Sequence, residues 1–216
     1  MRILSFTGGP FAENGYVAVC PATRQAVVVD PGASAPRMVA ALAEEDADLV
    51  AILLTHAHLD HVEGVPRILE SADVPVYLHP ADRPLWDAAP QQAVAFGLTA
   101  PRLPDPDHAL AHGEPFRFGE VELAVRHAPG HAPGHVIFWH EASGAALVGD
   151  VIFEGSIGRT DLPGGDFRQL ITSIREQVLT LPDDTRLLTG HGYETSVGWE
   201  RRNNPFLTPQ YGGELA

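Results

Sequence analysis

Lysine is absent from this sequence, and all 14 of its basic side chains are arginine. This excludes Schiff-base catalysis by lysine, a P-loop lysine and a Ser-Lys dyad. The sequence also lacks a Gly-x-Ser-x-Gly motif, so a serine-hydrolase elbow has no support. Cysteine occurs once, as Cys20, which excludes a disulfide framework within the chain. Because Cys20 ends an apolar stretch, we expect a buried small side chain there in preference to a catalytic thiol.

Positive charge is scarce, because 28 acidic residues give the chain a formal net charge of −14 at pH 7. This balance argues against nucleic-acid binding through phosphate contacts and against attachment to an anionic membrane surface. No apolar run approaches the ~20 residues that a membrane span requires, and residues 1–6 do not resemble a signal peptide. We therefore expect a cytoplasmic protein with a small-molecule partner. The sequence carries no signal for an oligomeric state.

The length of 216 residues fits one large domain or two small ones, and the hydrophobic pattern predicts strands and helices in each half, as in an α/β protein, with no linker that would separate independent domains. Helices are predicted from Ser34, over 64–72, over 80–96 with interruptions at Pro84 and Pro90, and from Asp166. A proline-rich segment over 97–113 is expected to form a wall of the active site or a link between two β-rich halves. The predicted strands cover 2–6, 15–20, 25–29, 49–54, 74–78, 116–118, 121–126, 136–140, 145–148 and 186–189.

Four metal-ligand side chains lie within six residues, directly after the apolar strand predicted over 49–54. They are His56, His58, Asp60 and His61. Imidazole and carboxylate groups are the ligands that zinc and iron bind in proteins. Because His56 and His58 are two residues apart, their side chains point the same way on an extended backbone. Asp60 and His61 follow a turn and can face a second metal.

Three further segments place histidine or aspartate beside glycine at the end of a predicted strand. They contain His131 and His135, then Asp150, and finally His191. With one histidine of the pair His131 and His135 counted, the cluster and these segments offer five nitrogen and two oxygen ligands, which suits two metals that share a carboxylate. Asp30 also ends a strand, and it is either a turn residue or a partner for a ligating histidine.

In this order and spacing, the motifs resemble those of the metallo-β-lactamase-fold superfamily. Residues 55–61, 128–135, 149–166 and 189–206 are similar to its glyoxalase II (hydroxyacylglutathione hydrolase) branch, and most of all to short, single-domain bacterial members. The resemblance implies a single domain over residues 1–216, a four-layer αββα sandwich of two similar halves, with the site where the strand ends converge. It also implies two divalent metal ions, expected to be zinc, although iron or manganese would suit the same ligands.

The resemblance further implies a role for each candidate residue. A metal-bridging hydroxide is expected to attack the substrate, and Asp60 and Asp150 are the catalytic carboxylates. His135 is expected to support a ligand, whereas His79, His108, His112, His127 and His140 are expected to be surface or structural residues. The first metal is assigned to His56, His58 and His131, the second to Asp60, His61 and His191, and Asp150 is assigned to both.

The implied substrate is a thioester, S-D-lactoylglutathione or another hydroxyacylglutathione, which would give glutathione and a 2-hydroxy acid. Arg159 either binds the glycinyl carboxylate or forms an ion pair with Asp161 or Asp166, and Tyr193 either touches glutathione or packs. The helical C-terminal domain of the longer relatives is expected to be missing. Alternatives are a mononuclear-iron persulfide dioxygenase using His56, His131 and Asp150, a hydrolase of other small esters or lactones, and a metal-binding redox or storage module that is not an enzyme.

Overall fold

The computed structural model describes residues 1–208, and its first half forms one six-stranded sheet with helices on its outer side. The order of strands in this sheet is β1-β2-β3-β4-β5-β6, and β3 to β6 run parallel to one another. The elements are β1 (Arg2–Gly8), β2 (Glu13–Val19), β3 (Gln25–Val29), α1 (Ala35–Glu44), β4 (Asp48–Leu53), α2 (Leu59–Val62), α3 (Val65–Leu69), β5 (Val76–Leu78), η1 (Pro80–Asp82), α4 (Arg83–Ala95) and β6 (His108–Ala109).

The second half forms another six-stranded sheet, in the order β14-β13-β10-β9-β8-β7, beside a separate two-stranded ribbon. Within the large sheet, β10 and β13 are parallel and the other pairs are antiparallel. The elements are β7 (Phe116–Phe118), β8 (Val121–His127), β9 (Val136–His140), η2 (Glu141–Ser143), β10 (Ala145–Gly149), β11 (Ile152–Phe153), β12 (Ser156–Ile157), α5 (Phe167–Ser173), η3 (Ile174–Val178), β13 (Arg186–Thr189), β14 (Thr195–Ser196) and α6 (Val197–Asn203).

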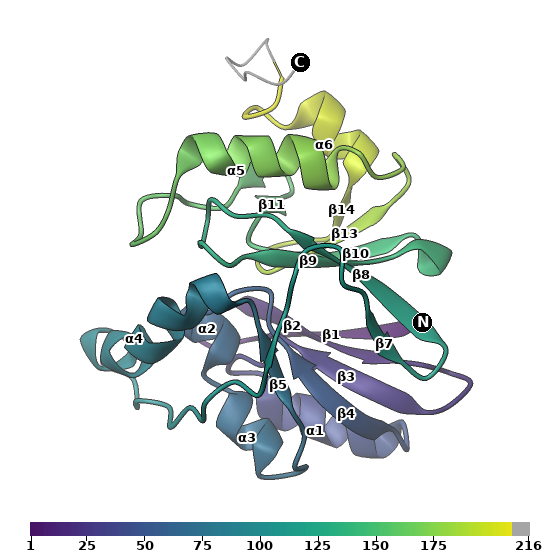
Figure 1. The fold of residues 1–216 in the computed structure, drawn as a ribbon, viewed down its shortest axis with the longest axis vertical. Helices are drawn as coiled ribbons and strands as arrows, with labels where there is room; N and C mark the ends of the chain where they lie inside the picture. Colours follow the sequence, from purple (N-terminus) through teal and green to yellow (C-terminus); the bar gives the residue numbers. More distant parts are fainter. Residues whose placement is uncertain (209–216) are drawn as a thin grey trace.

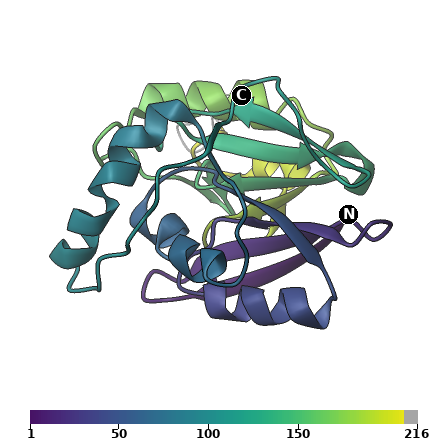
Figure 2. The same cartoon turned by 60° about the horizontal axis from the view of Figure 1, so that its bottom comes forward.

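The two sheets face each other, with α1 and α3 outside the first and α5 and α6 outside the second (Figure 1). The view in Figure 2 likewise places α1 and α5 on opposite outer faces. This is the predicted αββα sandwich, and the α/β fold class is confirmed. The first sheet is covered on both faces, and every residue of β2 is accordingly buried.

Three apolar layers hold the sandwich together. Val17 and Met38 belong to the layer between the first sheet and its helices, and Leu170 belongs to the layer beneath α5. Val27 and Phe138 lie in the layer between the two sheets. In the part of the chain that the structure describes, no helix is both long enough and apolar enough to cross a bilayer.

The predicted strands are present, whereas several helices differ from prediction. Pro90 lies inside α4 without ending it, so the expected interruption there is wrong; Pro84 stands in the first turn, where proline is tolerated. The helix predicted over 64–72 is the shorter α3. The segment 97–113 contains an edge strand, β6, which pairs with β5. The helix from Asp166 continues into the π-helical turn η3.

The topology brings the ends of parallel strands to one edge of the sandwich. β3 and β4 end close to Asp30 and His56, and β10 and β13 end close to Asp150 and His191. Direct contacts fix the two sheets against each other at this edge, because the Tyr16 hydroxyl donates to the Thr189 carbonyl at 2.7 Å. Chain segments far apart in the sequence thus meet at one site.

Candidate metal centre

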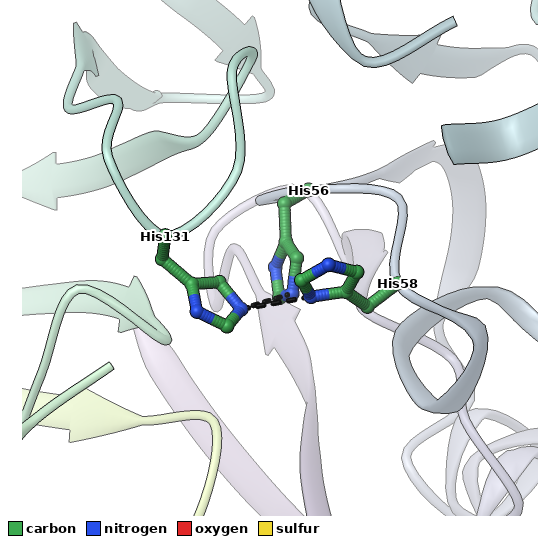
Figure 3. A group of neighbouring side chains, drawn as sticks. All are labelled: His56, His58 and His131. Atoms are coloured by element: carbon green, nitrogen blue, oxygen red, sulfur yellow. Dashed lines mark hydrogen bonds between the residues drawn. The ribbon is translucent and has the colours of Figure 1, made fainter. Parts of the chain in front are cut away.

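Three histidines from two loops aim their ring nitrogens at one point (Figure 3). His56 follows β4, His58 is the N-cap residue of α2, and His131 lies in the loop between β8 and β9. The Nε2 atom of His131 lies 3.2 Å from Nε2 of His56 and 2.8 Å from Nδ1 of His58. All three side chains are buried. They make up the nitrogen group of the site.

A second group contains Asp60, His61 and His191. Asp60 and His61 occupy the single turn of α2, and His191 follows β13. Nε2 of His191 lies 3.2 Å from Oδ2 of Asp60, and Nε2 of His61 lies 4.0 Å from the same oxygen. This mixed group contains one carboxylate and two imidazoles.

Asp150 touches both groups. Its Oδ2 lies 3.4 Å from Nε2 of His131 in the nitrogen group and 3.5 Å from Nε2 of His191 in the mixed group. Its Oδ1 lies 3.4 Å from Nε2 of His61. The structure therefore brings together all seven predicted ligands, with Asp150 between the two sets.

The outward nitrogen of each of three ligands is fixed by an acceptor. Nδ1 of His131 donates to the Arg159 carbonyl at 2.7 Å, and Nδ1 of His191 donates to the Phe11 carbonyl at 3.1 Å. Nδ1 of His61 lies 3.0 Å from the Asp30 carboxylate. Because carbonyl and carboxylate oxygens accept, each contact holds a proton on the outward Nδ1 atom, so that the inward Nε2 atom offers its lone pair to a metal once it carries no second proton. Asp30 thus serves as a ligand partner, and its φ of 49° also makes it a turn residue.

Thr55 fixes the orientation of the His56 ring in a similar way, through a hydrogen bond to Asp30. Its hydroxyl lies 2.6 Å from Oδ2 of Asp30, to which it donates, and 3.0 Å from Nδ1 of His56. Having given its proton to Asp30, the hydroxyl accepts from Nδ1 of His56, and Nε2 of that ring then has no proton. Asp30 also accepts from the Thr55 backbone N–H at 2.7 Å. One carboxylate thereby orients a ligand in each group.

The nitrogen and oxygen atoms that face one another in the site are suited to bind cations. Nε2 of His56 and Nε2 of His131 are both acceptors and face each other, so no proton joins them. Nε2 of His61 and Oδ1 of Asp150 are buried and have no hydrogen-bond partner among residues 1–208. Buried acceptors in such a state are costly unless a cation satisfies them. The residues present therefore fit a dinuclear metal site built from mixed nitrogen and oxygen ligands.

The electrostatics of the two groups differ. Burial and the neighbouring His131 lower the pKa of His58 to about 3. Burial opposes protonation of His191 as well, but hydrogen bonds to Asp150 and Asp60 raise its pKa to about 10. Burial also opposes ionisation of Asp150, yet His61 and His191 hold its pKa well below its ordinary value. The nitrogen group is thus neutral, whereas the ionised Asp150 carboxylate favours positive charge at the mixed group, whether a proton on a histidine or a metal cation.

Two supports of the site were missed by the sequence analysis. Asp82, at the end of η1, is fully buried and accepts from the backbone N–H of Ala57 at 2.9 Å and of Gly134 at 2.5 Å. It therefore joins the loop carrying His56 and His58 to the loop carrying His131. Thr55 is the other, although it stands beside the motif. No pattern in the sequence marks Asp82.

The remaining histidines lie outside the two ligand groups. His135 is buried, accepts from the Asp150 backbone N–H at 3.0 Å and stacks on His56 with ring centroids 4.7 Å apart. His127 lies 2.9 Å from the Pro133 carbonyl and stacks on His79. His140 bonds Ser143, whereas His108 and His112 are exposed.

A cleft of about 390 Å³ opens over the two groups. Arg159 lines it, and its guanidinium also makes two hydrogen bonds to Asp161, at 2.7 and 2.8 Å. Tyr193 is 79% exposed and is not among the described residues that line the cleft. The lining residues are Phe11, His58, Leu59, Asp60, Gln92, Phe96, His131, Asp150, Phe153, Ser156, Ile157, Arg159, Leu162 and His191.

The sequence of this chain matches a known protein family and a named relative. Residues 8–191 match the model of the metallo-beta-lactamase superfamily. The chain is 39% identical to the hydroxyacylglutathione hydrolase GloC of Haemophilus influenzae over 186 residues, which cover 85% of this chain and 88% of that protein.

Two solved structures are also similar. The BLEG-1 B3 metallo-beta-lactamase is 37% identical, with a TM-score of 0.89 over 96% of this chain and 100% of that one. TTHA1623 in a di-iron-bound form is 42% identical, with a TM-score of 0.85 over 94% of this chain and 100% of that one.

Proposed function

Because the chain belongs to the metallo-beta-lactamase superfamily and is a metallo-hydrolase, we propose that it hydrolyses thioesters, specifically hydroxyacylglutathiones, to glutathione and a 2-hydroxy acid. The observation that carries the proposal is the position of Asp150 between the two ligand groups, beneath an open cleft. S-D-lactoylglutathione is the reference substrate. The similarity to GloC supports the thioester assignment.

The candidate ligands fall into two sets that share Asp150. His56, His58 and His131 would hold one divalent cation, Asp60, His61 and His191 the other, and Asp150 both. When bound, two such cations supply a hydroxide nucleophile at neutral pH and Lewis acidity toward a carbonyl oxygen.

The chain's own groups position the reactants around that centre. Asp60 lines the cleft and is partly exposed, so its carboxylate can accept a proton from the attacking group and orient it. Arg159 lies in the cleft wall, where its guanidinium can pair with a substrate carboxylate. No side-chain nucleophile is required, which agrees with the absence of lysine from the sequence.

We propose zinc as the metal. The same ligands also accept iron, and the similar TTHA1623 was solved in a di-iron-bound form. Elemental analysis of the purified protein decides between them.

The test combines metal content with hydrolysis of S-D-lactoylglutathione. His56→Ala should lose metal and at least about a thousandfold in kcat/KM, because it removes one ligand of the nitrogen group. His108→Ala is the matched control, since His108 is an exposed histidine on β6 outside the site. Full turnover by His56→Ala, or none by the metal-loaded wild type, would overturn the proposal.

Persulfide oxidation is the second candidate, because His131 contacts both His56 and Asp150, and the three could form a mononuclear two-histidine, one-carboxylate site. Oxygen consumption with glutathione persulfide measures it directly. Two metals per chain and no oxygen uptake favour the hydrolase, whereas one iron and rapid uptake favour the oxygenase.

A further inference from the structure

The two ends of the cleft differ in chemistry. At one end His131 is bonded through Nδ1 to the Arg159 carbonyl, so the arginine backbone lies beside the nitrogen group. At the other end His191 is bonded through Nδ1 to the Phe11 carbonyl. The Phe153 ring also meets His191, edge-on, with ring centroids 5.9 Å apart. The cleft thus has an arginine end at His131 and an aromatic end at His191.

A third aromatic side chain extends the aromatic end. Phe96 follows α4 and meets Phe11 edge-on, with ring centroids 5.3 Å apart. Although it lines the cleft, Phe96 is 62% exposed. A large apolar side chain left open beside a reaction centre gains free energy when a ligand covers it. Phe11, Phe96 and Phe153 form a surface that we call the aromatic wall.

Resting on the thioester hydrolysis proposed above, we propose that the aromatic wall binds the acyl group, so that the preferred substrate carries an aromatic or branched apolar acyl chain. The thiol arm of the substrate then extends toward Arg159, which is the one arginine among the described residues that line the cleft. The guanidinium is already paired with Asp161, but its side chain is 61% exposed and can accept a second carboxylate.

The size of the cleft supports this assignment. A lactoyl group ends in a methyl, which is too small to cover three aromatic side chains in a cleft of about 390 Å³. A phenyl group at the same carbon can contact the wall while the 2-hydroxyl and the scissile carbonyl stay unchanged. Extra apolar contact of this size discriminates by about tenfold or more between substrates.

The test compares S-lactoylglutathione with S-mandeloylglutathione, which differ only in methyl against phenyl. For the wild type we expect kcat/KM to be at least about tenfold higher for mandeloyl. Phe96→Ser should lower kcat/KM for mandeloyl about tenfold and leave lactoyl within about twofold. Phe167→Ser is the matched control, since Phe167 is 45% exposed at the start of α5 and does not line the described cleft. It should change neither value.

A binding measurement separates this proposal from the proposed function. Calorimetry with the thioethers S-(2-hydroxy-2-phenylethyl)glutathione and S-(2-hydroxypropyl)glutathione should show about tenfold tighter binding of the phenyl compound, lost in Phe96→Ser. Equal binding with active hydrolysis of both thioesters would overturn the aromatic wall and leave the thioesterase standing. Preferential binding of the phenyl compound without hydrolysis of either thioester would support the wall and overturn the thioesterase.

Discussion

Removal of the Asp82 carboxylate should loosen both ligand loops at once. In Asp82→Ala, the backbone N–H groups of Ala57 and Gly134 lose their acceptor in a buried environment. Each orphaned donor costs about 1–3 kcal/mol. Burial of the carboxyl works against this, because it raises the pKa of Asp82 to about 6, so the native state resists its ionisation. Taken together, we expect the free energy of unfolding to fall by about 2–4 kcal/mol at pH 7.

The pH dependence gives this prediction a sign. The folded pKa of about 6 exceeds the ordinary value of 3.8, so the native state binds the proton more tightly than the unfolded state does. The proton-linked part of the contribution of Asp82 to stability is therefore fully present below pH 3.8 and is lost as pH rises through about 6, whereas the hydrogen bonds from Ala57 and Gly134 remain at pH 7. Asp82→Asn cannot titrate, and the part of the stability slope between about pH 4 and pH 6 that comes from this group should disappear.

The assay is urea unfolding followed by circular dichroism, with metal content measured on the same samples. Asp87→Ala is the matched control, because Asp87 is an exposed aspartate of α4 whose ion pair with Arg83 is worth well under about 1 kcal/mol. The reasoning would be refuted if Asp82→Ala unfolded within about 0.5 kcal/mol of the control and kept full metal content.

Two other supports of the site give further predictions. Asp30→Asn should weaken metal binding about 10–100-fold, because the carboxylate that orients His61 and Thr55 is lost. A competition titration with a chromogenic chelator measures the affinity, and an unchanged affinity would contradict the prediction. Tyr16→Phe should lower the free energy of unfolding by about 1–2 kcal/mol, because it removes the buried hydrogen bond to the Thr189 carbonyl. Urea unfolding at fixed metal content measures this loss, and a midpoint equal to that of the wild type would contradict the prediction.

The convergence of the seven candidate ligands could be predicted because they lie in short segments that follow recognisable apolar strands. Their supports could not be predicted in the same way. The acceptors for His131 and His191 are backbone carbonyls of Arg159 and Phe11, which any residue type supplies. Asp82 acts on two loops that come together only when the sheets dock, so local sequence contains no trace of its role.

The wrong prediction at Pro90 came from a rule that considers only local sequence. Sequence rules penalise proline inside a helix for its missing N–H and its steric conflict with the preceding turn. α4 nevertheless runs through Pro90, because Leu85, Trp86 and Ala89 bury its apolar face against the first sheet's outer layer. Tertiary packing here outweighs a cost of about 3 kcal/mol, which no local pattern could reveal.

The arrangement of ligands also links catalysis to the docking of the two sheets. His56 and His58 lie on the first half, whereas His131, Asp150 and His191 lie on the second. Neither half contains a complete ligand set, so a bound cation would contact the native sandwich far better than either half alone. Binding to the native state alone stabilises it in proportion to the logarithm of ligand concentration. The cations that would supply the chemistry would therefore also stabilise the docked arrangement of the two halves.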